Sequence, residues 1–336
     1  MTSPWQTEMA DAVRDPSELL ALLDLEPRWL EPARRAATAF PLRVPRAFIA
    51  RMRKGDPADP LLRQVLPLGQ ELDEVSGYIR DPVGDLPSVA ARGLLHKYQG
   101  RVLLITTGAC GVHCRYCFRR HFPYSEENAR SGEWQPALDY LRGDASINEV
   151  ILSGGDPLSL SDERLAGLVR ALEGIPHIRR LRIHTRQPVV LPSRVDEALL
   201  TWLKACRLQK VVVLHVNHAR EMDAAVQAAC AKLREAGATL LNQTVLLRGV
   251  NDSAEVLREL SEALFDAQVL PYYLNLLDPV AGAAHFDVPE AEALMLMAEI
   301  RARLPGYLVP RLVREVPGAP SKMPVTPDAE YASDGG

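Results

Sequence analysis

The sequence predicts an α/β fold built on parallel strands. Its 336 residues are 47% hydrophobic and 24% charged, a composition that excludes disordered and fibrous classes of protein. From residue 101 onward, short apolar runs rich in β-branched residues alternate with amphipathic stretches. Near-continuous hydrophobicity is typical of strands that are buried on both faces. The six runs are Arg101–Thr106, Glu149–Ser153, Arg180–Thr185, Lys210–Val216, Thr239–Leu246 and Val269–Leu276.

The amphipathic stretches between these runs carry the start and stop signals of helices. One begins at Ser161 and stops at Gly174, and the others are Pro192–Cys206, Arg220–Ala236, Ser253–Asp266 and Pro289–Leu304. Alternation of this kind requires right-handed parallel crossovers, which leaves a full or partial (β/α) barrel or a doubly wound sheet. In both architectures the chemistry lies beyond the carboxyl ends of the strands.

The first hundred residues differ from the rest of the chain. Proline-rich turns separate short amphipathic runs such as Ser17–Leu25 and Phe48–Lys54. We therefore expect three regions: a mostly helical N-terminal region at 1–95, a (β/α) core at 96–306 and a short C-terminal segment at 307–336.

The charge of the chain limits the kinds of partner it can bind, and its sequence also indicates its cellular compartment. Lys and Arg number 39 and Asp and Glu 43, so the net charge of −4 gives no global attraction to nucleic acid or to an anionic membrane. No run of about 20 apolar residues is present, and the first fifteen residues lack a secretory signal. We expect a cytoplasmic protein without a nucleic-acid or membrane partner. Its five cysteines are then ligands, nucleophiles or core residues rather than disulfides.

Three cysteines follow the first strand at C-x3-C-x2-C spacing. They are Cys110, Cys114 and Cys117, and three arginines crowd the same loop. Guanidinium charges favour thiolates, the metal-binding form of cysteine. Three thiolates without a fourth cysteine nearby suit a four-iron cluster that leaves one iron open to a non-protein ligand, because closed clusters usually take four.

Structural zinc is the alternative, with His113 or His121 as the fourth ligand of a non-enzymatic binding module. Zinc ribbons and fingers normally place two ligand pairs on separate turns, whereas here all candidates fall within twelve residues after one strand. The spacing therefore favours the cluster. Cys206 and Cys230 lie on apolar faces of predicted helices, where cysteines are usually core residues.

The cysteine loop together with a glycine pair resembles the radical S-adenosylmethionine enzymes. The pair is Gly154-Gly155, followed by Asp156, at the end of the second strand. The resemblance implies a partial (β/α)6-type barrel in which the three cysteines hold a [4Fe-4S] cluster. It also implies that S-adenosylmethionine binds the open iron through its amine and carboxylate, with the segment from Gly154 to Asp156 against the cofactor.

Further segments resemble lysine 2,3-aminomutases, over about residues 42–324. The closest fit is the short branch that makes (R)-β-lysine for modifying elongation factor P. The segments that carry the resemblance are His96-Lys97-Tyr98, Arg101, the run from Cys114 to Phe122, His215 to His218, Asn242 to Asp252, Ala284 to Phe286 and Pro317 to Pro324.

The resemblance implies pyridoxal 5′-phosphate as a second cofactor. Moving an amine between adjacent carbons needs its nitrogen held in a π-system that tolerates an unpaired electron, and pyridoxal phosphate supplies one. Lys322 is the expected Schiff-base lysine, and a lysine in a Pro/Gly-rich segment is otherwise a solvated residue. Lys97, Tyr98 and Arg101 match positions that hold the phosphate and ring, and Gln243 matches a cofactor contact.

Three residues match the positions that bind lysine in the family. Arg119 corresponds to the partner of the substrate carboxylate, since a guanidinium binds carboxylates in a bidentate way. Asp278 and Glu315 correspond to the two aspartates that face the side-chain ammonium. Glu in place of Asp at 315, and the sequence from Gly318 to Ser321 in place of a glycine run, depart from the family pattern.

The expected activity is conversion of L-α-lysine to (R)-β-lysine by an isomerase, with β-lysine supplied to elongation factor P. A free β-lysine product or another substrate such as glutamate is the alternative, although Asp278 and Glu315 would repel a glutamate side chain. The expected partners are L-lysine, an electron donor of flavodoxin or ferredoxin type, and a functional link to elongation factor P and its lysyl ligase. Only fourteen residues follow Lys322, so we expect a monomer or dimer. Two further residues at strand ends, His184 and His215, are candidates for either ligand contacts or core packing.

Overall fold

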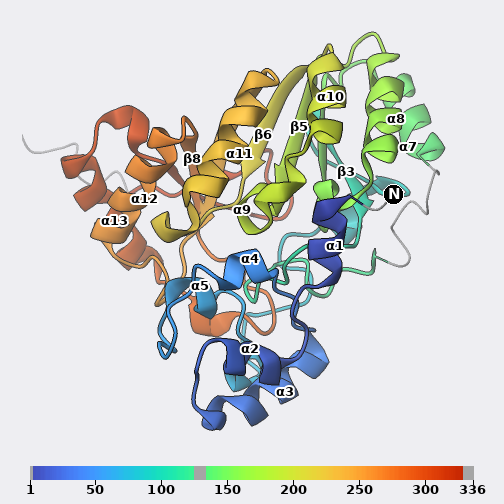
Figure 1. The fold of residues 1–336 in the computed structure, drawn as a ribbon. Helices are drawn as coiled ribbons and strands as arrows, with labels where there is room; N and C mark the ends of the chain where they lie inside the picture. Colours follow the sequence, from blue (N-terminus) through green and yellow to red (C-terminus); the bar gives the residue numbers. More distant parts are fainter. Residues whose placement is uncertain (1–2, 125–133, 328–336) are drawn as a thin grey trace, which may run out of the picture.

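A computed structural model describes residues 3–124 and 134–327 of the chain, so part of the expected C-terminal segment, 328–336, lies outside the described residues. Within that range the strands form one ten-stranded sheet in sequence order (Figure 1). The strands β3 to β9 are parallel, and antiparallel strands extend both edges. The bounds are β1 Val89–Ala91, β2 Leu94–Tyr98, β3 Arg101–Thr107, β4 Glu149–Gly154, β5 Arg180–Thr185, β6 Gln209–Leu214, β7 Ala238–Val245, β8 Leu270–Asn275, β9 Arg311–Arg314 and β10 Met323–Pro324.

The six predicted strands are confirmed as β3 to β8, with ends shifted by at most two residues. The sequence pattern missed β9, a seventh parallel strand, because Arg311 and Arg314 bound it and leave no apolar run. Its place comes from pairing with β8, where Tyr273 lies opposite Arg311. Since β1 and β10 are the two ends of the order, the sheet of the described residues stays open, as a partial barrel requires.

Helices cover one face of the sheet (Figure 1), where α8 packs beside α10, α11 on β7, and α12 on β8. The helices α8, α12 and α13 begin within one residue of their predicted starts, whereas α10 and α11 begin later than predicted, at Glu197 and Ala224. A polar side chain caps the first turn of these two helices, since Asp196 accepts a hydrogen bond from Leu199 N and Asp223 accepts one from Val226 N. The bounds are α7 Gln135–Gly143, α8 Asp162–Glu173, α9 Gln187–Val190, α10 Glu197–Ala205, α11 Ala224–Glu235, α12 Ala254–Asp266 and α13 Glu290–Arg303.

The main core lies between the sheet and these helices. All six residues of β4 are buried, and Leu152, Leu172 and Leu181 are fully enclosed. This explains why the strands carry apolar residues on both faces: one face meets the helices and the other lines the interior of the curved sheet.

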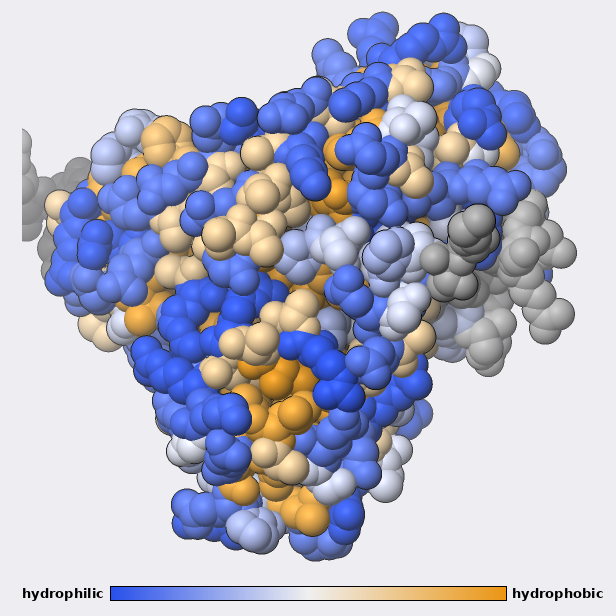
Figure 2. Space-filling view, viewed as in Figure 1, coloured by the Kyte–Doolittle hydropathy of each residue, from blue (hydrophilic) through white to orange (hydrophobic). Residues whose placement is uncertain are grey.

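The N-terminal helices form a separate group next to the cysteine loop (Figure 1, blue). They have their own core, which includes Leu19 and Phe48 and extends to Val112 in the loop. Over these helices, Figure 2 shows apolar side chains between hydrophilic ones. The expected boundary at 95/96 falls within β2, so the sheet begins before the expected core. The helices are α1 Pro4–Ala10, α2 Pro16–Leu22, α3 Leu30–Ala39, α4 Arg46–Ile49 and α5 Pro60–Arg63.

Candidate active site

The three cysteines lie in the loop that leaves the carboxyl end of β3. All three thiols are free, and Cys117 N donates to the Cys114 carbonyl at 3.1 Å in a tight turn. The N-terminal region holds the loop through its backbone, since His113 N donates to Arg43 O at 2.9 Å and Arg115 N to Gln64 O at 2.9 Å. The loop is therefore fixed from outside the sheet.

Each of the two histidines of the zinc alternative uses one ring nitrogen in a hydrogen bond to a backbone carbonyl, which leaves its other nitrogen for a metal. The Nδ1 atom of His113 is 2.7 Å from Pro41 O, and the Nε2 atom of His121 is 3.0 Å from Ala281 O. Nowhere in the described residues do three His, Cys, Asp or Glu side chains converge on a single metal-ion position. A four-iron cluster does not require such convergence, because each cysteine binds a separate iron. The geometry thus argues against the zinc site.

Burial raises the pKa of two of these thiols. It raises the pKa of Cys110 well above its ordinary value, with Cys117 and Asp156 adding to the effect. It also raises the pKa of Cys117 to about 11, with Cys114 adding to the effect. Thiols of this kind ionise when a metal replaces the proton, so the loop suits a resident cluster better than a free nucleophile.

The glycine pair at the end of β4 has no room for side chains. Gly154 has a φ of +117°, and a Cβ there would meet Thr107 O at 2.6 Å. A Cβ on Gly155 would collide with the Ala109 carbonyl, and Gly155 N donates to Thr107 O at 2.6 Å. The pair lets β4 pack against the cysteine loop, which leaves its backbone beside the thiols.

Asp156 holds the strand ends together. It is 5% exposed, and its side chain accepts from Leu158 N at 3.0 Å, Thr185 Oγ1 at 2.7 Å and Arg186 N at 2.7 Å. Despite these donors, burial raises its pKa. These contacts join the end of β4 to that of β5, and the expected cofactor contact of Asp156 remains a prediction.

The arginines of the loop have different partners. Arg115 and Arg120 both bind the buried carboxylate of Glu71, at 2.5 and 2.7 Å. Arg119, expected to bind the substrate carboxylate, donates through Nε to Asp85 Oδ2 at 2.6 Å and through Nη1 to Ser153 Oγ at 3.0 Å. Sequence reasoning missed Asp85, because a lone aspartate in a proline-rich stretch resembles a turn residue.

Asp85 also binds Lys97, the expected phosphate partner. The Lys97 Nζ atom is 2.6 Å from Asp85 Oδ1 and donates to Val83 O at 2.7 Å. Burial alone would raise the pKa of Asp85, but Arg119 and Lys97 together lower it below its ordinary value. One buried carboxylate therefore links the two cations that were expected to hold anions of substrate and cofactor.

Lys322 reaches the sheet from the C-terminal segment. Its Nζ donates to Asn275 Oδ1 at 3.0 Å and lies 3.1 Å from Glu315 Oε2. The other oxygen of Glu315 accepts from the hydroxyl of Tyr98 on β2. Burial raises the pKa of Tyr98 well above its ordinary value, with the Glu315 carboxylate adding to it. The structure thus brings together three residues that the resemblance named, and adds Asn275 at the end of β8.

The remaining predicted residues are Asp278, Arg101 and Gln243, of which Asp278 interacts with Lys322. Burial raises the pKa of Asp278 to about 6, and the charge of Lys322 opposes that rise. The Arg101 guanidinium stacks over the Tyr98 ring, 4.6 Å from its centroid, and has no carboxylate partner among the described residues. Gln243 lies on β7, half-buried, opposite Tyr273 of β8.

Two neutral histidines line the same interior from the ends of β5 and β6. The rings of His184 and His215 are 5.7 Å apart and perpendicular. Burial lowers the pKa of His215 to about 4, with Arg186, Lys322 and Arg119 adding to it, so the ring is neutral at pH 7. The Nε2 atoms of both rings are buried without a hydrogen-bond partner. Such atoms fit a ligand that enters this interior.

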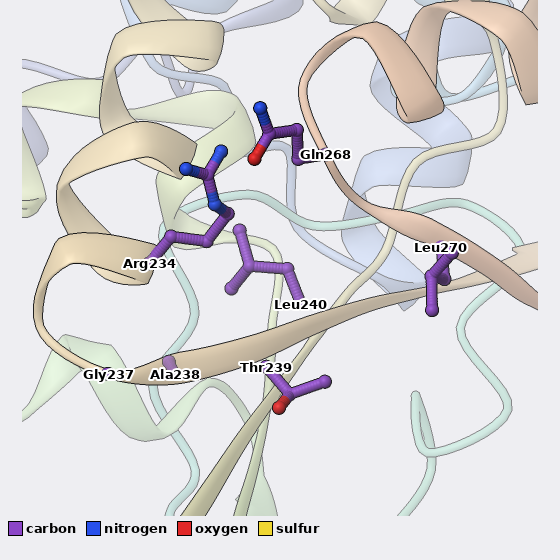
Figure 3. Close-up of a pocket in the computed structure, with 7 residues that line it drawn as sticks. All are labelled: Arg234, Gly237, Ala238, Thr239, Leu240, Gln268 and Leu270. Carbon is purple, nitrogen blue, oxygen red and sulfur yellow. The ribbon is translucent and has the colours of Figure 1, made fainter.

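A surface pocket of about 410 Å³ lies elsewhere (Figure 3). Residues at the amino ends of β7 and β8 line it, with Arg234 and Gln268 at its edge. It is at the opposite end of the strands from the cysteine loop, so it is separate from the candidate site.

The model of the radical SAM superfamily matches residues 104–260, the part of the chain that holds the three thiols, the glycine pair and the two neutral histidines. The chain belongs to the lysine 2,3-aminomutase family. It is 52% identical to the L-lysine 2,3-aminomutase of Escherichia coli (strain K12), over 96% of this chain and 94% of that one. It is 46% identical to the L-lysine 2,3-aminomutase of Haemophilus influenzae, over 95% and 94%.

A solved radical SAM methyltransferase from Sphaerobacter thermophilus is also similar, at 19% identity and a TM-score of 0.46, over 66% of this chain and 68% of that one. The match to L-lysine 2,3-aminomutases, and not this structural likeness, shows that the chain is an enzyme, an isomerase of this type. No helix of the described residues is long and apolar enough to cross a membrane.

The cofactors of this family are a [4Fe-4S] cluster, S-adenosylmethionine and pyridoxal 5′-phosphate, and the residues present fit them. The buried thiols suit the cluster, and the unpartnered imidazole nitrogens suit a ligand beside it. Lys322 suits an aldehyde, and Arg101, which has no carboxylate partner among the described residues, suits a phosphate.

Proposed function

We propose that the chain converts L-α-lysine to (R)-β-lysine with pyridoxal 5′-phosphate on Lys322, and that this β-lysine is destined for elongation factor P. The observation that carries the proposal is the position of Lys322 Nζ. It lies at the end of β8, held by Asn275 at 3.0 Å and Glu315 at 3.1 Å. A lysine in a solvated tail would have no such partners, so its place supports covalent attachment of the cofactor.

Cys110, Cys114 and Cys117 would hold the cluster, and Gly154 and Gly155 would present backbone to S-adenosylmethionine. Together these cofactors supply a carbon radical able to remove a hydrogen atom from the substrate, and pyridoxal phosphate supplies the π-system for the migrating nitrogen. The electron enters from a donor of flavodoxin or ferredoxin type.

The chain's own residues position lysine and exclude water. Arg119 would bind the substrate carboxylate, for which Nη2 is its donor without a partner in the described residues. Asp278 and Glu315 would face the side-chain ammonium, and both lie near Lys322. Lys97, Arg101 and Tyr98 would surround the cofactor's phosphate and ring, with Gln243 as a further contact. Because a radical attacks whatever it reaches, such positioning matters more than acid–base groups.

Glu315 retains the function of the family's aspartate in this proposal. Its carboxylate is fixed by the Tyr98 hydroxyl, so the longer side chain is held in place. With Asp278 it gives the pocket two acidic groups, which favour a side-chain ammonium over the carboxylate of glutamate.

The direct test is anaerobic incubation of the reconstituted enzyme with lysine, a reductant and S-adenosylmethionine, followed by chiral analysis of the diamino acid. The proposal expects (R)-β-lysine. Formation of the (S)-isomer would contradict the assigned product, and turnover of glutamate but not lysine would contradict the roles of Asp278 and Glu315. The link to elongation factor P is tested separately, by supplying the product to its lysyl ligase.

A further inference from the structure

Arg186 makes a contact that the proposed function does not use. It follows the last residue of β5, is 5% exposed, and its Nη1 atom lies 2.8 Å from the Sγ atom of Cys114. Sequence reasoning gave it no role, since an arginine after a strand carries no motif of its own. A fully buried guanidinium directed at a thiol needs an explanation, because burying a charge is costly.

The other edge of this guanidinium is held by two buried groups. Its Nη2 atom donates to Gln64 Oε1 at 2.6 Å and to Glu221 Oε2 at 2.9 Å, and Glu221 is 0% exposed. The carboxylate thus lies on the side away from Cys114. Although the ion pair is neutral overall, the charge nearest the sulfur is positive.

Glu221 is itself fixed. Its Oε1 atom accepts from Asn217 N at 3.0 Å, His218 N at 3.1 Å and Gln64 Nε2 at 3.1 Å. Gln64 also accepts a hydrogen bond from Arg115 N through its backbone carbonyl, within the cysteine loop. The network therefore joins the N-terminal helices, the end of β5 and the loop after β6 around one cysteine. Replacing a buried ion pair by apolar residues is often neutral or stabilising, so stability alone does not account for it.

We propose that Arg186 is a positioning residue for the iron–sulfur cluster. Its guanidinium donates a hydrogen bond to the Cys114 thiolate and makes the cluster easier to reduce. This inference rests on the cysteine ligation of the proposed function. Reduction adds one negative charge to the cluster, and an N–H donor with a positive charge stabilises the reduced form more than the oxidised one. Hydrogen bonds to the sulfurs and net charge are the known determinants of such potentials.

The experiment measures the midpoint reduction potential of the full-length, anaerobically reconstituted protein without S-adenosylmethionine, by redox titration monitored with electron paramagnetic resonance. Arg186→Gln should shift the potential to a more negative value, because the uncompensated Glu221 charge then faces the cluster. Glu221→Gln should shift it to a more positive value. The double variant should fall between the two, and Arg186→Lys between Arg186→Gln and the wild type.

Arg194 offers a matched control. It is also fully buried and pairs with Asp162 at 2.8 Å, but it contacts no cysteine. Arg194→Gln should lose a comparable amount of thermal stability while leaving the potential of the cluster unchanged. Iron content is measured for every variant, so that loss of cluster is separated from a shift in potential.

The inference is wrong if Arg186→Gln has the iron content and the reduction potential of the wild type. It is also wrong if Arg194→Gln shifts the reduction potential as much as Arg186→Gln does. Should Arg186→Gln fail to fold or load, Glu221→Gln decides: a potential at or below that of the wild type overturns the inference. A wild-type chain that binds no iron–sulfur cluster would instead overturn the proposed function, so the two failures are distinguishable.

Discussion

Two regions of the interior are built in different ways. The cysteine side comprises Cys110, Cys114, Cys117, the glycine pair and Arg186, and backbone hydrogen bonds and a buried ion pair hold it. The lysine side comprises Lys322, Glu315, Asp278, Tyr98 and Arg119. Side-chain contacts hold most of it, since Glu315 binds Lys322 and Tyr98, and Arg119 binds Asp85. Tyr98 and Glu315 are 217 positions apart in the chain.

The difference leads us to expect two responses to ligands. On the cysteine side the backbone of Gly155 is already in place, because a Cβ there would collide with Ala109 O. On the lysine side we expect ligands to alter existing contacts: an aldehyde on Lys322 would displace Glu315, and a substrate carboxylate would share Arg119 with Asp85. The first region would then be preorganised, and the second would rearrange when it binds ligands.

The largest effect is expected from a substitution that removes a cluster ligand on the cysteine side. Cys117→Ala should reduce iron from about four per chain to far below that and abolish turnover, because three thiolates are the minimum for this cluster. Iron and sulfide analysis after anaerobic reconstitution measures it. Cys230→Ala, at a buried cysteine in α11, is the matched control and should retain full iron. Equal iron content in the two variants would contradict the role of Cys117 as a cluster ligand.

Lys322→Ala breaks the lysine side while leaving the cysteine side intact. It should abolish the pyridoxal absorbance band and lower kcat by roughly 10³-fold or more, as for loss of other covalent catalytic groups. Iron content should not change. Lys210→Ala is the control, since Lys210 binds Cys206 O at the far end of β6. A normal absorbance band in Lys322→Ala would assign the cofactor to another lysine.

A substitution at Arg119 tests whether its guanidinium group binds the substrate. Arg119→Lys keeps the charge that Asp85 needs but loses the separate Nη2 donor for the substrate carboxylate. A charge-assisted hydrogen bond contributes about 1.5–3 kcal/mol, so KM for lysine should rise about 10- to 100-fold. Steady-state kinetics at saturating cofactors measure it. An unchanged KM would show that Arg119 only supports Asp85.

The pH dependence sharpens the role of Asp278. Burial raises its pKa to about 6, so it is protonated and neutral below that pH and charged above it. Only the charged form attracts the ammonium of lysine, and kcat/KM should therefore fall roughly tenfold per pH unit below about 6. Asp278→Asn should give a low kcat/KM without this acid limb. If kcat/KM of Asp278→Asn fell over the same pH range, the fall would be due to another titrating group.

The smallest expected effect concerns the hydroxyl of Tyr98. Tyr98→Phe keeps the ring under Arg101 and removes only the hydrogen bond to Glu315. A loss of about 1 kcal/mol corresponds to about a fivefold rise in KM for lysine. If the absorbance of bound cofactor changes while KM does not, Tyr98 acts on the cofactor rather than through Glu315.

The three cysteines were predictable because they are close in sequence and follow a strand. The six strands were predictable for a related reason, since burial on both faces leaves an apolar run that a short, charged strand such as β9 lacks. The contacts of the lysine side were not derivable from spacing, and only the resemblance named its residues. Asp85, Asn275 and Arg186 had no signal of their own, because a buried polar residue in a loop or at a strand end is recognised only when its partner is known.

One isotope experiment tests most directly that the two regions act on one lysine molecule. Lysine deuterated at its β-carbon is incubated anaerobically with the reconstituted enzyme, S-adenosylmethionine and reductant, and the 5′-deoxyadenosine is analysed by mass spectrometry. We predict deuterium in 5′-deoxyadenosine from the wild type and none from Lys322→Ala. Deuterium-free 5′-deoxyadenosine from a wild-type enzyme that still forms β-lysine would contradict the account.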